Sequence, residues 1–489
     1  MTIAKPARIF DRDRDWRALV AYAENPQPEA TLGVVSGRRR QGKTYLLTAL
    51  AEVTGGFYFE AEEAAGAEAL RMLGRAIGEF SGAPGDLRLD DWDDALTALF
   101  ALSARRSGPL IIDEFPLLMK ANPTLPSKLQ RHLDEGWSGL SSPHGPARLL
   151  LCGSAMSVMG GLLAGQAPLR GRAGLELVVR PLSYRDTARF WDITDPRLAI
   201  LVSAVTGGTP AYRRQFVRND SPADMDDFDD WVCRTVLSPE TPLFREARYL
   251  LAEEVEARDP GLYHSVLAAI AGGRATNGRI AAYLGRTSAE IAHPLNVLED
   301  SHLVSRQPDV FRKGRSTYQI AEPLITFYQA VMRPRWAVLD LGHAQRVWPQ
   351  AQQAFLSQAV GPRFEQICRD WALLADDLFG EPPGEVGSGV VTDPANRTQI
   401  EIDVSVFAAT VPGERRRVLS LGEVKWGRTM GMRDLSRLER ARDLITQNGF
   451  DTATAKLACY SGSGFDDHLR EAAAYRADVL LVGPDQLYA

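Results

Sequence analysis

The chain has 489 residues, more than one hydrophobic core usually accommodates, so about two to four domains are expected. Its apolar share of 45% and charged share of 24% are ordinary for globular proteins and exclude a disordered or fibrous chain. The net charge of -6 excludes a protein that is basic throughout, so any binding of nucleic acid requires a local basic face.

The sequence also bears on the cellular compartment. Nothing near the N-terminus is typical of a signal peptide, because the charged residues 11–15 follow Lys5 and Arg8. No apolar stretch approaches the length of about 18 residues that a membrane span needs. The four cysteines are far apart and form neither a zinc spacing nor a disulfide framework: Cys152, Cys233, Cys368 and Cys459. We therefore expect a cytoplasmic protein with no membrane partner.

The first part of the chain has the rhythm of a parallel α/β sheet. An apolar run at 31–36 is followed by a glycine-rich turn, a helical pattern at 45–53 and a second apolar run at 57–60. Two later apolar runs, at 110–112 and 149–152, end in polar residues, where the strands of an open parallel sheet place functional groups. The pattern predicts a sheet with helices on both faces.

The rest of the chain changes character twice. After Pro181, helical patterns predict a lid at 184–191, 198–205 and 242–255. Residues 261–320 then combine three short helical patterns with two strand-like runs around a charged turn, the outline of a winged helix-turn-helix. From about residue 347, a helix precedes strand-like runs at 402–407, 418–424 and 456–460, which predict a separate α/β domain.

A glycine-rich loop at 37–44 predicts a nucleotide site. Its sequence, Gly-Arg-Arg-Arg-Gln-Gly-Lys-Thr, matches the Walker A pattern between a predicted strand and a predicted helix. Gly37 and Gly42 permit backbone angles that turn successive N–H groups toward phosphates, and Lys43 adds a charge toward the β and γ phosphates. Thr44 is expected to ligate Mg²⁺. ATP and Mg²⁺ are therefore the predicted cofactors.

Two carboxylates follow the apolar run Leu-Ile-Ile at 110–112. Asp113 is expected near the metal ion, and Glu114 near the water that attacks the phosphate. The alternative is that Asp113 only caps the following turn. The presence of the loop 37–44 in the same chain favours ATP hydrolysis.

Polar residues follow the next strand as well. Ser154 can sense the γ-phosphate, as the sensor 1 residue of AAA+ proteins does, or it can simply close a tight turn. Arg170 and Arg172 lie in the following loop, and a planar guanidinium can neutralise charge on the phosphoryl group within one chain or across a subunit boundary. A homo-oligomer is compatible with the second arrangement. The alternative for both arginines is a solvated loop position.

Several short motifs together resemble the archaeal-type ATPase family, a branch of the AAA+ and STAND ATPases. They are Phe10-Asp11-Arg12, the loop 37–44, Ile112-Asp113-Glu114, Gly153-Ser154, Pro168-Leu169-Arg170-Gly171-Arg172, Pro181-Leu182-Ser183-Tyr184 and Gly207-Gly208-Thr209-Pro210. The resemblance covers roughly residues 1–215 and implies a nucleotide-driven switch with Arg172 at the family's arginine position. Where AAA+ proteins carry a sensor 2 arginine in the lid, this chain has the Gly-Gly-Thr-Pro turn.

The expected winged helix is basic. From residue 261 to residue 320 there are seven Lys or Arg against four Asp or Glu, a net of +3, which suits contacts with DNA phosphates. The recognition helix is predicted at 287–304, kinked or shortened by Pro294. Its inward-facing residues are expected to be Ile291, Leu295, Leu298 and Leu303, and the wing tip is Arg312-Lys313-Gly314-Arg315. The alternative is a module that packs against the ATPase or a protein partner.

The last part of the chain contains a second acidic site. Asp403 and Glu423 lie on neighbouring predicted strands and can hold Mg²⁺, while Lys425, on the same face as Glu423, can stabilise an attacking hydroxide. With Glu365 in the preceding helix, this resembles the PD-(D/E)XK core of restriction-endonuclease-like nucleases. The resemblance implies three metal ligands, Glu365, Asp403 and Glu423, and a catalytic Lys425. The alternatives are an ordinary cross-strand charge pair and a nuclease-shaped domain that does not cut.

These patterns predict an α/β ATPase core, a helical lid, a winged helix and a nuclease-like domain, at 1–190, 191–258, 259–335 and 336–489. The function they favour is ATP hydrolysis coupled to DNA binding and to a Mg²⁺-dependent nuclease. The alternative is an ATP-gated regulator that binds DNA or protein and whose nuclease-like domain is inactive.

Overall fold

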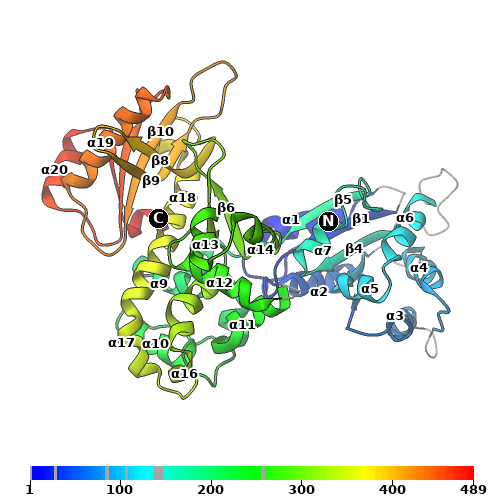
Figure 1. Cartoon of the computed structure of the whole chain (residues 1–489). Helices are drawn as coiled ribbons and strands as arrows, with labels where there is room; N and C mark the ends of the chain where they lie inside the picture. The colour runs from blue at the N-terminus through cyan, green and yellow to red at the C-terminus, as the bar shows by residue number, and fades with distance from the viewer. Residues whose placement is uncertain (1–2, 27–29, 83–86, 105–107, 136–146, 255–258) are drawn as a thin grey trace. The chain divides into compact units, whose positions relative to one another are not determined.

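The structure is a computed structural model that describes residues 3–26, 30–82, 87–104, 108–135, 147–254 and 259–489. The chain divides into two compact units, Met1–Pro181 and Leu182–Ala489, each with a five-stranded sheet (Figure 1). Among the residues described, no helix is long and apolar enough to pass through a membrane. The finer division into four domains stays a prediction.

The sheet of the first unit is parallel, in the order β2-β3-β4-β1-β5. Its strands are Thr31–Ser36 (β1), Phe57–Glu60 (β2), Leu110–Asp113 (β3), Arg148–Gly153 (β4) and Ala173–Val178 (β5). The parallel sheet expected from the sequence is thereby confirmed, with β1 to β4 close to the predicted runs. The edge strand β5 was not predicted, because only every second residue is even half-buried and no continuous apolar run marks it.

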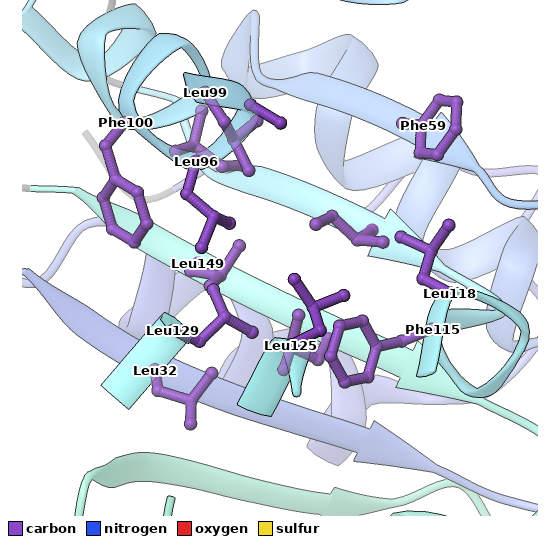
Figure 2. Packing of buried hydrophobic residues seen from close by; sticks show 14 of the residues in the cluster. Leu32, Phe59, Leu96, Leu99, Phe100, Phe115, Leu118, Leu125, Leu129 and Leu149 are labelled. Carbon is purple, nitrogen blue, oxygen red and sulfur yellow. The ribbon is translucent and has the colours of Figure 1, made fainter. Parts of the chain in front are cut away.

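Helices cover both faces of this sheet, because successive side chains of a strand point to opposite sides. Leu149 and Leu151 join the core that contains Leu96 and Leu129 (Figure 2), whereas Leu150 packs into the other core. The helices are Asp13–Ala23 (α1), Lys43–Thr54 (α2), Gly66–Ser81 (α3), Trp92–Ala101 (α4), Phe115–Ala121 (α5), Leu125–Glu135 (α6) and Met156–Gly161 (α7). Buried hydrophobic side chains pack both faces of the sheet, so the strand ends are held in place.

The second unit begins with the helices that the sequence predicted as a lid. They are Tyr184–Phe190 (α8), Pro196–Thr206 (α9) and Pro242–Glu254 (α11), and a further helix between them, Phe228–Thr235 (α10), was not predicted. The last residue of the predicted segment 242–255 lies outside the described residues. Helix α9 packs against three later helices, Pro323–Phe327 (α15), Gly361–Leu373 (α18) and Pro484–Tyr488 (α21). The predicted lid segment therefore shares a core with the C-terminal part of the chain.

Three helices and a hairpin follow, in the predicted order. They are Pro260–Ala271 (α12), Asn277–Leu284 (α13), Ser288–Asp300 (α14), Val304–Pro308 (β6) and Ser316–Ile320 (β7). Helix α14 begins after a capping box between Thr287 and Glu290. It is shorter than the predicted 287–304, because the chain turns at His302, whose φ is 56°. Pro294 lies inside the helix without ending it, and the four residues expected to face inward are buried.

The C-terminal sheet is mixed, in the order β12-β11-β10-β9-β8. Its strands are Glu385–Asp393 (β8), Thr398–Phe407 (β9), Val418–Lys425 (β10), Lys456–Ser461 (β11) and Val479–Val482 (β12). The main helices around it are α18, Met432–Gln447 (α19) and Asp467–Tyr475 (α20), whereas Ala344–Phe355 (α17) packs against α10. The edge strand β8 was not predicted, because it carries glycines in place of apolar side chains. The edge strand β12 was missed, although its sequence is the apolar run Val-Leu-Leu-Val.

The turn between β6 and β7, residues 309–315, is docked on the C-terminal sheet. Val310 belongs to that sheet's hydrophobic core, and its amide donates to Ser388 O at 3.1 Å. The ring of Phe311 meets that of Phe450 edge to face, with centroids 5.6 Å apart. A Cβ on Gly387 would come within 2.5 Å of Val310, so glycine is required in β8 for this close approach.

Candidate functional site

The loop 37–44 leaves β1 and enters α2 in the conformation of a phosphate-binding loop. Gly37 has φ 153°, and a Cβ there would lie 2.5 Å from Val179 O, so no other residue fits without a shift. Gly42 precedes the helix with φ 89°. The buried Lys43 ammonium donates to the carbonyls of Gly37 and Arg38 at 2.6 and 3.1 Å. Those two bonds hold the charge of Lys43 over its own loop.

Asp113 stands at the end of β3 and is fully buried. Its Oδ2 accepts hydrogen bonds from the hydroxyls of Thr44 at 2.7 Å and Tyr58 at 3.0 Å, and its Oδ1 accepts from the amide of Glu114 at 2.9 Å. The first of these bonds joins the start of α2, the helix that follows β1, to the end of β3. Strand β4 lies between β1 and β3 in the sheet. The structure therefore brings together Thr44 and Asp113, which are far apart in the sequence.

Tyr58 is a member of this cluster that the sequence reasoning missed. Burial raises the pKa of its hydroxyl, and the Asp113 carboxylate raises it further. The hydroxyl therefore stays protonated and acts as a donor. Its position depends on β2 pairing with β3, which the order of the strands along the chain does not reveal. The only sequence signal was a tyrosine in a short apolar run beside the acidic strand end.

Two features orient the Glu114 carboxylate: a left-handed backbone conformation and hydrogen bonds from one serine. Its φ of 49° and ψ of 41° are left-handed, a conformation that costs a non-glycine residue about 1 kcal/mol or more. Ser154, at the end of β4, places its Oγ 3.1 Å from Oε1 and 3.2 Å from Oε2 of Glu114. The two residues thus form a pair beside Asp113.

The two loop arginines are held by other groups. Arg172 forms a forked pair with Asp134, with Nε 2.7 Å from Oδ1 and Nη2 2.8 Å from Oδ2, and Arg170 donates to the carbonyl of Gly165. No described contact joins Arg172 to the Asp113 cluster. Arg12, from the motif at 10–12, donates through Nη2 to Gln41 O at 3.1 Å and therefore supports the loop itself.

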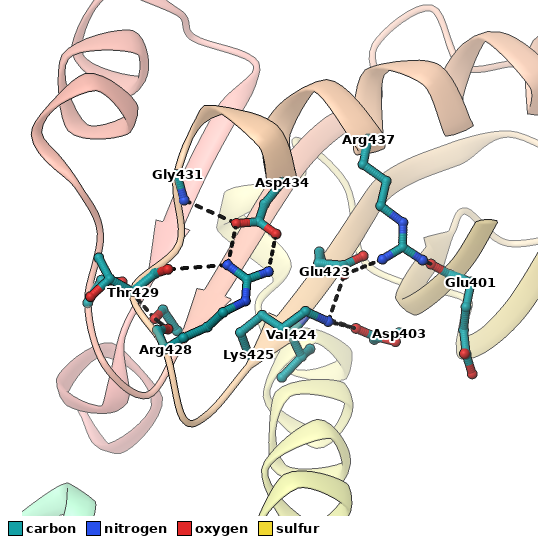
Figure 3. A network of polar contacts seen from close by, with 12 residues as sticks. Glu401, Asp403, Glu423, Val424, Lys425, Arg428, Thr429, Gly431, Asp434 and Arg437 are labelled. Carbon is teal, nitrogen blue, oxygen red and sulfur yellow. Dashed lines mark hydrogen bonds and ion pairs between the residues drawn. The ribbon is translucent and has the colours of Figure 1, made fainter. Parts of the chain in front are cut away.

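The C-terminal sheet carries the second cluster (Figure 3). Lys425 Nζ lies 2.7 Å from Glu423 Oε1 and 3.9 Å from Asp403 Oδ2. Arg437 from α19 reaches the same Glu423 oxygen at 2.7 Å. Glu423 is only 1% exposed, and its other oxygen, Oε2, is buried without a hydrogen-bond partner. The structure therefore gathers Asp403, Glu423 and Lys425, with Arg437 as a neighbour that the sequence reasoning missed.

Carboxylates crowd one another in this second cluster. Burial, followed by the charges of Glu365 and Glu423, raises the pKa of Asp403 to about 8. Desolvation raises the pKa of Glu365 as well, aided by Glu401 and Glu423 and opposed by Arg369. Among the described residues, no group of three or more His, Cys, Asp or Glu side chains is arranged to hold a metal ion. Glu365, Asp403 and Glu423 are thus close enough to interact without forming a complete ligand set.

Comparisons with known proteins give distant similarities. No family model matches the chain. An uncharacterized protein of Methanocaldococcus jannaschii is 25% identical over 371 residues, which are 75% of this chain and 77% of the relative. A Walker-type ATPase of Pyrococcus abyssi is similar with a TM-score of 0.48 and 20% identity, covering 66% of this chain and 96% of that structure. The ORC2 protein of Aeropyrum pernix has a TM-score of 0.42 and 15% identity, with 72% and 97% covered. Function is therefore inferred from the two clusters.

Proposed function

We propose that the chain is a P-loop ATPase that binds ATP with Mg²⁺ at the loop 37–44. The observation that carries this proposal is the 2.7 Å contact between the Thr44 hydroxyl and Asp113 Oδ2 at the start of α2. Hydroxyl and carboxylate oxygens are ligands that Mg²⁺ accepts beside nucleotide phosphates, so these two residues fit the ion. When bound, the ion neutralises charge that develops on the transferred phosphoryl group.

The remaining residues of this cluster have separate tasks in the proposal. The amides of the loop bind the phosphates, and Lys43 exchanges its two carbonyl partners for phosphate oxygens. Glu114 orients the attacking water and accepts its proton, and Ser154 keeps the carboxylate aimed. Arg172 contributes only after it leaves Asp134.

The test of this proposal is ATP hydrolysis by purified wild type and by Lys43→Ala. The variant loses the charge that meets the β and γ phosphates, so turnover should fall to background. Arg39→Ala is the matched control, because it removes a cation from the same loop at a position outside the proposed contacts. Turnover that survives Lys43→Ala contradicts the assignment of the site.

We propose further that residues 261–320 bind DNA and that residues 336–489, the predicted nuclease-like domain, form a Mg²⁺-dependent nuclease. Support for the nuclease comes from the buried, unpartnered Oε2 of Glu423 and from the raised pKa of the neighbouring Asp403. The three carboxylates do not form a complete ligand set as they stand, so a cation would relieve both features only after Glu365 moves to join Asp403 and Glu423. Lys425 would then stabilise the negative charge of the attacking group.

A specific observation favours a second candidate, an ATP-gated regulator that binds DNA or protein and whose nuclease-like domain at 336–489 does not cut. Lys425 and Arg437 both occupy Glu423 Oε1, so two cations already compensate this carboxylate. A nicking assay with Mg²⁺ or Mn²⁺ separates the candidates. Cleavage by wild type that is lost in Asp403→Ala and Lys425→Ala supports the nuclease. DNA retention without any cleavage supports the regulator, and equal cleavage by all three proteins identifies a contaminant.

A further inference from the structure

The charges of the region 260–303 are strongly segregated. Residues 260–286, which contain α12 and α13, include three arginines and no Asp or Glu. Residues 287–303, which contain α14, include three acidic residues and no Lys or Arg. In a helix-turn-helix, the helix at the position of α14 enters the major groove. Here that helix would bring its negative charges close to the phosphates, which repel them.

The basic half presents an exposed surface formed by α13 and the turn that precedes it. The Arg274 guanidinium lies over the ring of Tyr283, with its Cζ 4.3 Å from the centroid, and Tyr283 is 51% exposed. Arg279 is exposed one helical turn before Tyr283, so the two side chains are neighbours. Neither Arg274 nor Arg279 forms an ion pair with any residue that the structure describes; Arg274 contacts the carbonyl of Gly272 and the ring of Tyr283. Both charges therefore remain available to an anionic partner.

The other two candidate DNA surfaces of this region are less suited to the role. On α14, Glu290 is engaged in the capping box, and the end of the helix carries Glu299 and Asp300. The turn 309–315 is docked on the C-terminal sheet through Val310, and its Arg312 donates to Thr392 Oγ1 at 2.7 Å. A docked turn has little freedom to follow a groove.

We propose that Arg274, Arg279 and Tyr283 form the surface that contacts the phosphate backbone of duplex DNA, with α14 turned away from it. This inference rests on the proposed DNA binding and specifies where it occurs. Phosphate contacts carry no sequence information by themselves, so binding through this surface is independent of sequence. The docked turn then fixes the bound DNA relative to the C-terminal sheet.

The test is the affinity of the full chain for a labelled DNA duplex, measured by fluorescence anisotropy over a range of salt concentrations. Arg274→Ala combined with Arg279→Ala removes two phosphate contacts. The slope of log K against log salt should become shallower by about 2, and the affinity at about 0.1 M salt should fall about 60-fold. The matched control, Arg346→Ala combined with Arg415→Ala, removes the same charge from exposed positions elsewhere and should change neither value. Tyr283→Ala should weaken binding more than Tyr283→Phe.

The outcomes distinguish this surface from the wider proposal. Lys313→Ala combined with Arg315→Ala tests the turn 309–315. The inference is overturned if wild type binds the duplex and affinity falls in the Lys313/Arg315 double variant but not in the Arg274/Arg279 double variant. Equal losses of affinity in the Arg274/Arg279 variant and in the control variant also overturn it, because bulk charge would then explain the binding. Wild type with no affinity at low salt overturns the proposed DNA binding itself.

Discussion

Substitution of Tyr58 by phenylalanine tests the cluster around Asp113 through its energetics. The hydroxyl that would be lost donates a hydrogen bond to a carboxylate with no solvent exposure. A hydrogen bond to a charged group contributes about 1.5 to 3 kcal/mol, and the buried oxygen has no water to replace it. We expect amide hydrogen exchange in β3 to accelerate roughly 10- to 150-fold in the protein without nucleotide.

Addition of ATP with Mg²⁺ should reduce this penalty, because the ion takes the place of the missing donor at Asp113. Exchange mass spectrometry on β3 peptides, with and without nucleotide, measures both effects. Tyr45→Phe is the matched control, since that hydroxyl donates to Arg8 O at 3.3 Å on an exposed side chain. If the β3 peptides of Tyr58→Phe and Tyr45→Phe exchange at the same rate, the hydrogen bond from Tyr58 to Asp113 does not stabilise β3, which contradicts the proposed role of Tyr58.

Three further predictions concern single residues. Ser154→Ala should lower kcat for ATP hydrolysis about 10-fold or more with little change in KM, because Glu114 loses its aim; steady-state kinetics with unchanged kcat would contradict this. Gly37→Ala should abolish binding of a fluorescent nucleotide, because the new Cβ meets Val179 O at 2.5 Å, and normal affinity would show that the loop adjusts freely. The pKa of Asp478 is lowered to about 2 chiefly by its hydrogen bond from Arg476. The ionised carboxylate therefore stabilises the folded state above the unfolded pKa near 3.8, and this stabilisation is lost as the pH falls toward 2. Asp478→Asn should flatten that acid-induced drop in the thermal unfolding midpoint, and an unchanged pH profile would refute the assignment.

The sequence predicted the parts of the fold that burial controls directly. Strands β1, β3 and β4 are buried almost throughout, so their apolar runs coincide with their boundaries to within a residue. The edge strands β5 and β8 are half-exposed or glycine-bearing, and no continuous apolar run separates them from loops. Strand β12 is the apolar run Val-Leu-Leu-Val, a signal that the sequence reasoning missed. Thr44 could be predicted because it has a fixed place in the Walker A pattern, and Asp113 because it directly follows a buried apolar strand.

Other features depend on tertiary contacts between distant segments. The pairing of Tyr58 with Asp113 requires the sheet order, and the pairing of Arg172 with Asp134 joins residues that no motif connects. The docking of the turn at Val310 arises from Gly387 in a strand that the sequence did not predict. In each case the position of a residue is set by a contact with a residue distant in the sequence, and the local sequence does not reveal that contact.

The central claim is that the loop 37–44 binds ATP together with Mg²⁺, and titration calorimetry tests it most directly. The account predicts a heat of binding when ATP and Mg²⁺ are added to folded wild type, and none with folded Lys43→Ala. The absence of any heat with the wild type, or equal heats for both proteins, would contradict it.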